Sequence, residues 1–191
     1  FQVRGAIGLR DVHARASFSP ARLEGLRADL TLTPEVAHIT NLSTSVTVPA
    51  GPATPAGRFD VGLEARVDEW SRRPVVSLQR MKTSPVALPV VASLIPWEKL
   101  GESAEPVKQT LLNGGTVTIE EAVLPKIELF NLPKSPVEVL PKAKAAAGFA
   151  GLTLEPNPGL PGLEDIKGRI KLENGVLTAA GVQGRMGPLS L

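Results

Sequence analysis

The stretch LEDIKGRIKLENGVLTAAGV, residues 163–182, has the pattern of a strand, a two-residue turn and a second strand. In its first half, Ile166, Ile170 and Leu172 alternate with charged side chains, which is a period of two. The Asn-Gly pair at 174–175 is typical of a tight turn between antiparallel strands. Because successive residues of a strand point to opposite faces, the stretch predicts a sheet with one apolar and one solvated face.

A second stretch, LEGLRADLTLTPEVAHITNL at 23–42, has the same pattern 140 positions earlier (163 − 23), with a turn expected at its TPE segment. A Gly-x-x-Gly-Leu strand precedes each copy, at 5–9 and at 148–152, where the offset is 143 (148 − 5). Repetition of such a unit predicts a fold built from similar β-meanders. Four pairs are identical between the two stretches: Leu23 and Leu163, Glu24 and Glu164, Leu32 and Leu172, and Val36 and Val176.

The rest of the chain divides into three expected regions. Residues 1–80 form a first β-meander region, 81–113 a helical insert, and 114–191 a second β-meander region. The cleanest strand pattern lies at 59–68, and residues 131–161 are rich in proline, which lacks the N–H needed by an interior strand. We expect further strands at 75–80, 116–121, 126–130 and 137–140, short helices at 88–95 and 103–112, and loops and edge pieces across 131–161.

The predicted fold is therefore mainly β and antiparallel, with a small helical insert. A strand with one apolar face must bury that face, and two arrangements achieve this. The first is a long curled sheet with an open apolar groove. The second is a closed β-sandwich, in which two apolar faces pack against each other.

The composition narrows the possible functions. Apolar residues make up 42% of the 191 residues, charged residues 21% and aromatic residues 4%, and the net charge is +2. The basic residues are interspersed with acidic ones, so no basic patch for nucleic acid is expected. The apolar run at 85–97 is too short for a membrane span and contains three prolines. Because the sequence starts at Phe1 and stops in mid-pattern at Leu191, we expect it to be a fragment of a longer protein.

Residues suited to catalysis are few. His13 and His38 are the two histidines, and the chain has no cysteine, so neither has a partner at metal-ligand spacing. No Gly-x-Ser-x-Gly motif is present. The adjacent carboxylates at 120–121 and 68–69 are expected to face opposite sides of a strand. We therefore predict no catalytic residues, no metal site, no cofactor and no enzymatic activity.

The apolar strand positions are the candidate functional residues. They either form a dry core or line a groove that holds hydrocarbon, and mid-sized aliphatic side chains without aromatic plugs suit such a groove. Acyl chains have no polar groups to match, and each buried CH₂ contributes about 0.8 kcal/mol. The predicted groove-lining residues are Leu30, Leu32, Phe59, Val61, Leu63, Val117, Ile119, Ile170 and Leu172.

Two segments also resemble a known family. The pattern LxxIxGxIxLxNGVLxxxxVxGxxGxxxL from Leu163 to Leu191 resembles the C-terminal repeat of AsmA-like proteins of the TamB and YhdP type. The segment VKQTLLNGGTVTIEEAVLP at 107–125 resembles the central section of the YhdP-type members. The resemblance implies a β-taco, a sheet folded along its length around an apolar groove.

The resemblance also implies a function. Proteins of this family are similar to bridge-like lipid-transfer proteins, which are anchored in the inner membrane, cross the periplasm and carry phospholipid toward the outer membrane. The implied partners are phospholipid acyl chains, adjacent repeats of the same chain and membrane-embedded envelope proteins. Two alternatives remain open: a structural or adhesive β-sandwich module, and an envelope hydrolase.

Overall fold

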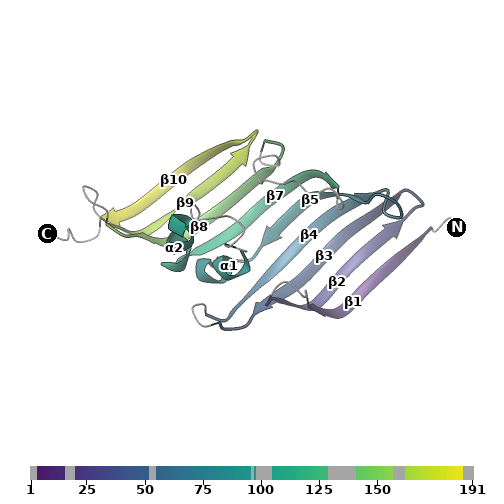
Figure 1. The fold of residues 1–191 in the computed structure, drawn as a ribbon, viewed down its shortest axis with the longest axis horizontal. Helices are drawn as coiled ribbons and strands as arrows, with labels where there is room; N and C mark the ends of the chain where they lie inside the picture. The colour runs from purple at the N-terminus through teal and green to yellow at the C-terminus, as the bar shows by residue number, and fades with distance from the viewer. Residues whose placement is uncertain are drawn as a thin grey trace.

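The chain folds into a single antiparallel β-sheet that is open and curled, as a computed structural model shows for residues 4–15, 20–51, 55–95, 97, 105–128, 141–156 and 162–186 (Figure 1). The strand order follows the chain, β1-β2-β3-β4-β5-β7-β8-β9-β10, and the short strand β6 pairs with β7. The prediction of an open curled sheet with a small helical insert is confirmed, and a closed sandwich is not observed. The strands are β1 (Gly5–Arg15), β2 (Arg22–Leu32), β3 (Val36–Val48), β4 (Gly57–Asp68), β5 (Val75–Thr83), β6 (Val86–Ala87), β7 (Thr116–Glu128), β8 (Lys144–Leu154), β9 (Leu163–Glu173) and β10 (Val176–Met186).

Bulges bend most of these strands near their middle. Three residues of the first three strands, Asp11, Gly25 and Asn41, have left-handed φ values of 55°, 61° and 52°. Each lies where the register with a neighbouring strand shifts by one residue. A bulge of this kind increases the local twist and bends the strand, so a row of bulges in adjacent strands curls the sheet.

The last three strands carry equivalent bulges. Gly151, Asp165 and Gly181 have left-handed φ values of 67°, 51° and 62°, and the register shifts beside each of them. These residues lie exactly 140 positions after the first three bulge residues (151 − 11, 165 − 25 and 181 − 41). The bulge residues of the two sets of strands therefore keep a constant offset of 140 in sequence. This holds also for β1 and β8, for which the Gly-x-x-Gly-Leu motif suggested an offset of 143.

Strand β7 differs from the sequence prediction. The pieces expected at 116–121 and 126–130 are one strand, Thr116–Glu128, and residues 129–130 and 137–140 lie outside the described part. Pro125 does not break the strand, because it lies at a register shift between Leu124 and Ile127, where the ladder with β5 has a bulge.

Strand β8 overturns another expectation. Residues 131–161 were expected to form loops and edge pieces apart from a Gly-x-x-Gly-Leu strand at 148–152. The strand observed is longer, Lys144–Leu154, and lies in the interior of the sheet between β7 and β9. The prolines nearest to it, Pro141 and Pro156, lie just outside its two ends, so every ladder position of β8 keeps its N–H.

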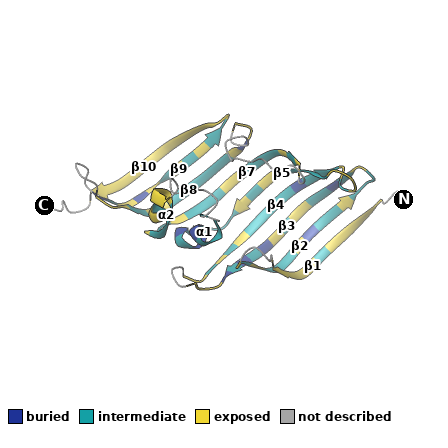
Figure 2. Cartoon of the chain, viewed as in Figure 1, coloured by how far each residue is buried: buried dark blue, intermediate teal, exposed yellow. Residues whose placement is uncertain are grey.

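The insert contains the two short helices predicted, α1 (Leu88–Leu94) and α2 (Glu105–Leu112). Proline in the first turn of α1 is compatible with a helix start. Because β5 pairs directly with β7, the insert leaves the sheet continuous. Figure 2 shows buried residues in α1 and along β2 to β4, whereas β1 and β10, the two edges of the sheet, are almost wholly exposed.

Candidate functional site on the apolar face

Strand pairing collects the apolar residues of nine strands on one side of the sheet, which we call the apolar face. Residues directly opposite each other on neighbouring strands share a face, so the register assigns each paired residue to one side. The apolar face contains Ile7, Leu9 and Val12; Leu23, Leu26, Ala28, Leu30 and Leu32; Ala37, Ile39, Leu42, Val46 and Val48; Phe59, Val61, Leu63, Ala65 and Val67; Val76, Leu78 and Met81; Val117, Ile119, Ala122, Leu124 and Ile127; Ala145, Ala147, Phe149, Leu152 and Leu154; Leu163, Ile166, Ile170 and Leu172; and Leu177, Ala179 and Met186.

The bulges are needed to keep this face apolar. Leu23 and Leu26 are three residues apart, so a regular strand would place them on opposite faces. The bulge at Gly25 adds one residue between them, and both therefore lie on the apolar face, opposite Ala14 and Val12. A slip of one residue without this correction would turn every later side chain of the strand to the other face.

All nine predicted groove-lining residues lie on the apolar face. The register places Leu30, Leu32, Phe59, Val61 and Leu63 there in the first half of the sheet, and the remaining four in the second half. None of the nine is fully buried and none is fully exposed. A dry core between two layers would bury such side chains completely, whereas these remain partly accessible to solvent.

Helix α1 covers one part of the apolar face. Its Val90 is 1% exposed and forms a buried cluster with Val46, Val48 and Val86. Three of the predicted groove-lining residues pack against this cluster: Phe59, Val61 and Val117. The helical periodicity of the insert predicted the helix, and the structure adds which residues of the sheet it contacts.

The apolar face carries no paired charged residue, and its two polar side chains are satisfied. Thr44 is buried, and its hydroxyl donates a hydrogen bond to the Glu24 carbonyl at 3.1 Å. Thr83 accepts a hydrogen bond from the Ile119 amide at 3.0 Å. Hydrocarbon could therefore contact this face without leaving a buried polar group unpaired.

The opposite side, the polar face, carries the ion pairs of the described strands. Arg10 Nη2 lies 2.8 Å from Asp29 Oδ1, and the hydrogen bond from this guanidinium, followed by one from Asn41, lowers the pKa of Asp29. Arg66 lowers the pKa of Asp68 in the same way, from 2.7 Å. The pKa of Glu173 is lowered by hydrogen bonds from Lys171 and Lys144, which lie 2.7 and 3.1 Å away. These charged side chains favour exposure of the polar face to water.

The adjacent carboxylates Glu120 and Glu121 do not face opposite sides, contrary to the sequence expectation. The register of β7 with β8 shifts between Ile119 and Glu121, so Glu120 is the bulged residue. Its carboxylate forms an ion pair with Arg169 on the polar face, which raises the pKa of that guanidinium. Glu121 pairs with Ala146 on the same face. The bulge thus overrides simple alternation.

The two histidines lie on the polar face near opposite ends of the strands. His38 pairs with Thr31 and Arg66, whereas His13 borders hollows of about 580 and 390 Å³ near the other end. The two histidines are about 20 Å apart along the strand direction, so they do not belong to the same site. Within the described ranges, no group of three or more His, Cys, Asp and Glu residues is placed to hold a metal ion.

The extent of the exposed surface agrees with a single layer. The chain exposes 12725 Å² for a mass of 20.1 kDa, whereas a folded monomer of this mass exposes about 8,700 Å². A larger exposed surface is expected of a single open sheet, because α1 covers only one part of its apolar face. Among the helices that the structure describes, none is long and apolar enough to cross a membrane.

The pattern of alternation missed many residues of the apolar face. Leu23 and Leu42 are examples that lie beside bulges, where the period of two is interrupted. Gly, Asn or Asp within an alternating stretch is the available signal for such a bulge, because these residues adopt the left-handed conformation most readily. Comparison with known proteins gives no match, whether with family models, curated proteins or solved structures.

Proposed function

We propose that this chain is a non-enzymatic, lipid-conducting segment of an envelope protein of the AsmA-like type. One observation carries the proposal: an apolar face without paired charged residues that extends across nine strands and stays partly accessible to solvent outside the part that α1 covers. An exposed apolar surface of this extent marks a site of interaction rather than ordinary protein surface. The ligands proposed are the acyl chains of phospholipids.

The geometry favours a ligand that slides over one that is held in a pocket. Eight spacings of about 4.8 Å separate the nine strands, so the face is about 38 Å wide. It presents mostly aliphatic side chains and no convergent polar groups that would fix one orientation. Each CH₂ group that leaves water contributes about 0.8 kcal/mol wherever it binds along the face, so a lipid tail has many positions of similar free energy.

The two sets of three bulged strands support a modular origin for this face. We infer that β1–β3 and β8–β10 are copies of one unit, because their left-handed residues keep an offset of 140. Repeated units that each contribute one-sided strands lengthen the face without changing its character. In the proposed setting, the chain lies in the periplasm as part of a membrane-anchored protein, and adjacent repeats continue the sheet.

Native mass spectrometry of protein purified from cells tests the proposal. Bound phospholipid is expected on the unaltered chain, and its occupancy should fall severalfold in Leu30→Glu and Ile119→Glu, which place a carboxylate on the apolar face. The matched controls, Thr31→Glu and Thr118→Glu, alter the neighbouring residues on the polar face and should retain lipid. Equal lipid occupancy in all four variants would contradict the proposal.

The same experiment separates the alternatives. Protein that is free of lipid in every preparation would favour a structural or adhesive module, for which the exposed edge strands β1 and β10 offer pairing surfaces. A hydrolase would require a reacting group, and His13→Ala and His38→Ala are expected to leave lipid binding unchanged.

A further inference from the structure

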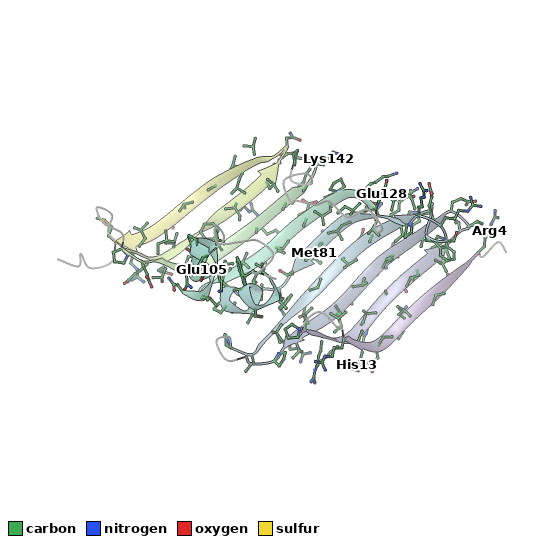
Figure 3. The ribbon with its side chains drawn as sticks, in the orientation of Figure 1. Arg4, His13, Met81, Glu105, Glu128 and Lys142 are labelled. Carbon is green, nitrogen blue, oxygen red and sulfur yellow. The ribbon has the colours of Figure 1, made fainter. Side chains whose placement is uncertain are left out.

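Three arginines and one threonine form a row across the first four strands, at one end of the polar face. Arg15 pairs with Arg22, Arg22 with Thr47, and Thr47 with Arg58. Directly paired residues share a face, so the four side chains extend from the sheet side by side, about 5 Å apart from one strand to the next. Figure 3 shows the position of this end by His13, with Arg4, Glu128 and Lys142 at the opposite end.

The row carries positive charge that no carboxylate pairs with directly. Like charges placed directly opposite each other on neighbouring strands are destabilising, and Arg15 and Arg22 are such a pair. Among the ion pairs of the described residues, none includes Arg15, Arg22 or Arg58. The connecting segments at this end, 16–21 and 49–56, contain no acidic residue in their sequence.

The nearest carboxylates along the strands, Asp60 and Glu24, form no ion pair with the arginines of the row in the described structure. Asp60 already accepts a hydrogen bond from Ser45 Oγ at 2.6 Å, and that hydroxyl in turn accepts one from Arg58 Nη2 at 3.2 Å. Glu24 lies two residues along the strand from Arg22, and no ion pair joins it to the row in the described structure. The guanidinium groups therefore retain donors for an external anion.

Thr47 adds an independent observation. Its hydroxyl is buried and, among the described residues, has no hydrogen-bond partner. It lies between Arg22 and Arg58, which flank it on the two neighbouring strands. A buried hydroxyl without a partner is destabilising, and an oxyanion between the two arginines would accept a hydrogen bond from it.

We propose that this row is a binding site for an oxyanion of the phosphate type, held by Arg22, Thr47 and Arg58 with Arg15 beside them. Arginine donors match phosphate oxygens in geometry and charge. Space for the anion is present beside the row, in the hollow of about 390 Å³ that Arg15 and Arg22 border together with Glu24. Arg58 borders a second hollow of about 580 Å³, whose lining includes Asp11, Glu24 and Asp60.

The position of the row suggests the source of the phosphate, in an inference that rests on the proposed function. Val46 and Val48, which flank Thr47, are covered by α1. Arg15, however, lies on the edge strand β1, and Val12 of the same strand is exposed on the apolar face, so the row and an open part of that face meet at this edge. A lipid tail on the apolar face would leave its headgroup outside, because that face carries no charged partner. The phosphate of a phospholipid can then reach the arginines around the strand ends.

Titration with inorganic phosphate at constant ionic strength, followed by amide NMR shifts, tests the site itself. Saturable shifts are expected at Arg22, Thr47 and Arg58. Arg22→Gln and Thr47→Val should each lower the affinity about tenfold. A control that removes the same kind of charge, Arg72→Gln with Arg73→Gln at the opposite end of the sheet, should leave the affinity unchanged.

Thr47→Val separates binding from structure. The change removes an unpaired hydroxyl with little change in volume, so the thermal midpoint without phosphate should stay equal or rise while phosphate affinity falls. Shifts that do not saturate, or equal losses of affinity in the control at 72 and 73, would overturn the site.

Flotation with phosphatidylglycerol vesicles distinguishes the two sources of phosphate. If the headgroup is the ligand, Arg22→Gln lowers the bound fraction severalfold and free phosphate competes. If flotation is unaffected by Arg22→Gln while the titration still saturates, the site belongs to free phosphate and the lipid assignment is overturned. Leu30→Glu should lower acyl-chain binding severalfold but leave the phosphate titration unchanged, so failure of the proposed function is recognised separately.

Discussion

Val90 of α1 lies directly over Gly57 of β4, and a Cβ atom built on Gly57 would be 2.8 Å from Val90 Cγ1 and closer still to Cγ2. Because Gly57 has no side chain, Val90 can pack against the backbone of β4 at this position. Without that contact, α1 could not reach the cluster that it forms with Val46, Val48 and Val86. One position in the sheet therefore controls how much of the apolar face is covered.

Gly57→Ala should displace α1 and uncover Phe59 and Val61. The added methyl group overpacks a close contact, which destabilises the chain by about 1–3 kcal/mol. We expect binding of a fluorescent apolar probe to increase, with the sheet retained by circular dichroism. The control is Gly62→Ala, where the nearest atom is the flexible Lys82 side chain at 3.3 Å. If probe binding is unchanged in Gly57→Ala, α1 does not limit access to this part of the face.

Truncations should separate the helix-covered cluster from the open face. Val48 is 1% exposed, so Val48→Ala leaves a cavity and is expected to cost about 2 kcal/mol. Leu172 is only partly buried, and Leu172→Ala should cost about 1 kcal/mol although it removes more atoms than Val48→Ala does. Urea unfolding measures both free energies. A loss of 3 kcal/mol or more for Leu172→Ala would mean that a dry core surrounds this side chain.

The left-handed conformation at the bulges predicts how substitutions there change stability. Gly181 has φ of 62° with no atom within 4 Å of a Cβ built on it, so a substitution there meets strain but no clash. Gly181→Val should cost about 1–2 kcal/mol, because a branched residue is strained in the left-handed conformation, and Gly181→Asn should cost less. Thermal unfolding of the two variants provides the comparison. Equal stability would show that the left-handed bulge is not required.

The sequence predicted the β-class and the one-sided strands because alternation is a local property. Strand β4 shows this most clearly: Gly57–Asp68 has no bulge of its own, and its alternation continues from end to end. The predicted residues of β4, including Phe59 and Leu63, lie on the apolar face as expected. Where a strand is regular, period two is sufficient to assign its faces.

Other features depend on contacts between distant segments. The position of Leu23 on the same face as Leu26 depends on the bulge at Gly25, and the shared face of Glu120 and Glu121 depends on the pairing of β7 with β8. The arginine row requires the register of four strands, which no local pattern supplies. The contact of α1 with Gly57 joins residues that are more than thirty positions apart, and no periodicity predicts it.

The ion pairs of the polar face predict the pH dependence of stability. The ordinary pKa of Asp29 and Asp68 is 3.8, and Arg10 and Arg66 lower it in the folded chain. A carboxylate with a lowered pKa stabilises the fold above its ordinary pKa, and this contribution is lost as the pH falls through the folded-state value. The urea concentration at the unfolding midpoint should therefore decrease when the pH is lowered below about 4.

Arg10→Gln provides the matched test of this dependence. It removes the donor that lies nearest to Asp29 without touching the apolar face. We expect the variant to lose less stability between pH 7 and pH 3 than the unaltered chain, and the difference to shrink at high salt because the pair is exposed. An identical pH profile for both proteins would contradict the assigned cause.

Photo-crosslinking in cells tests the central claim most directly. A photoreactive amino acid replaces one residue at a time in the full-length protein, at Leu30, Leu63 or Leu172 on the apolar face and at Thr31, Glu64 or Lys171 on the polar face. Adducts are then analysed for phospholipid by mass spectrometry. The account predicts lipid adducts at all three apolar positions and at none of the three polar ones; no lipid at Leu30, Leu63 and Leu172, or equal labelling of the two faces, would contradict it.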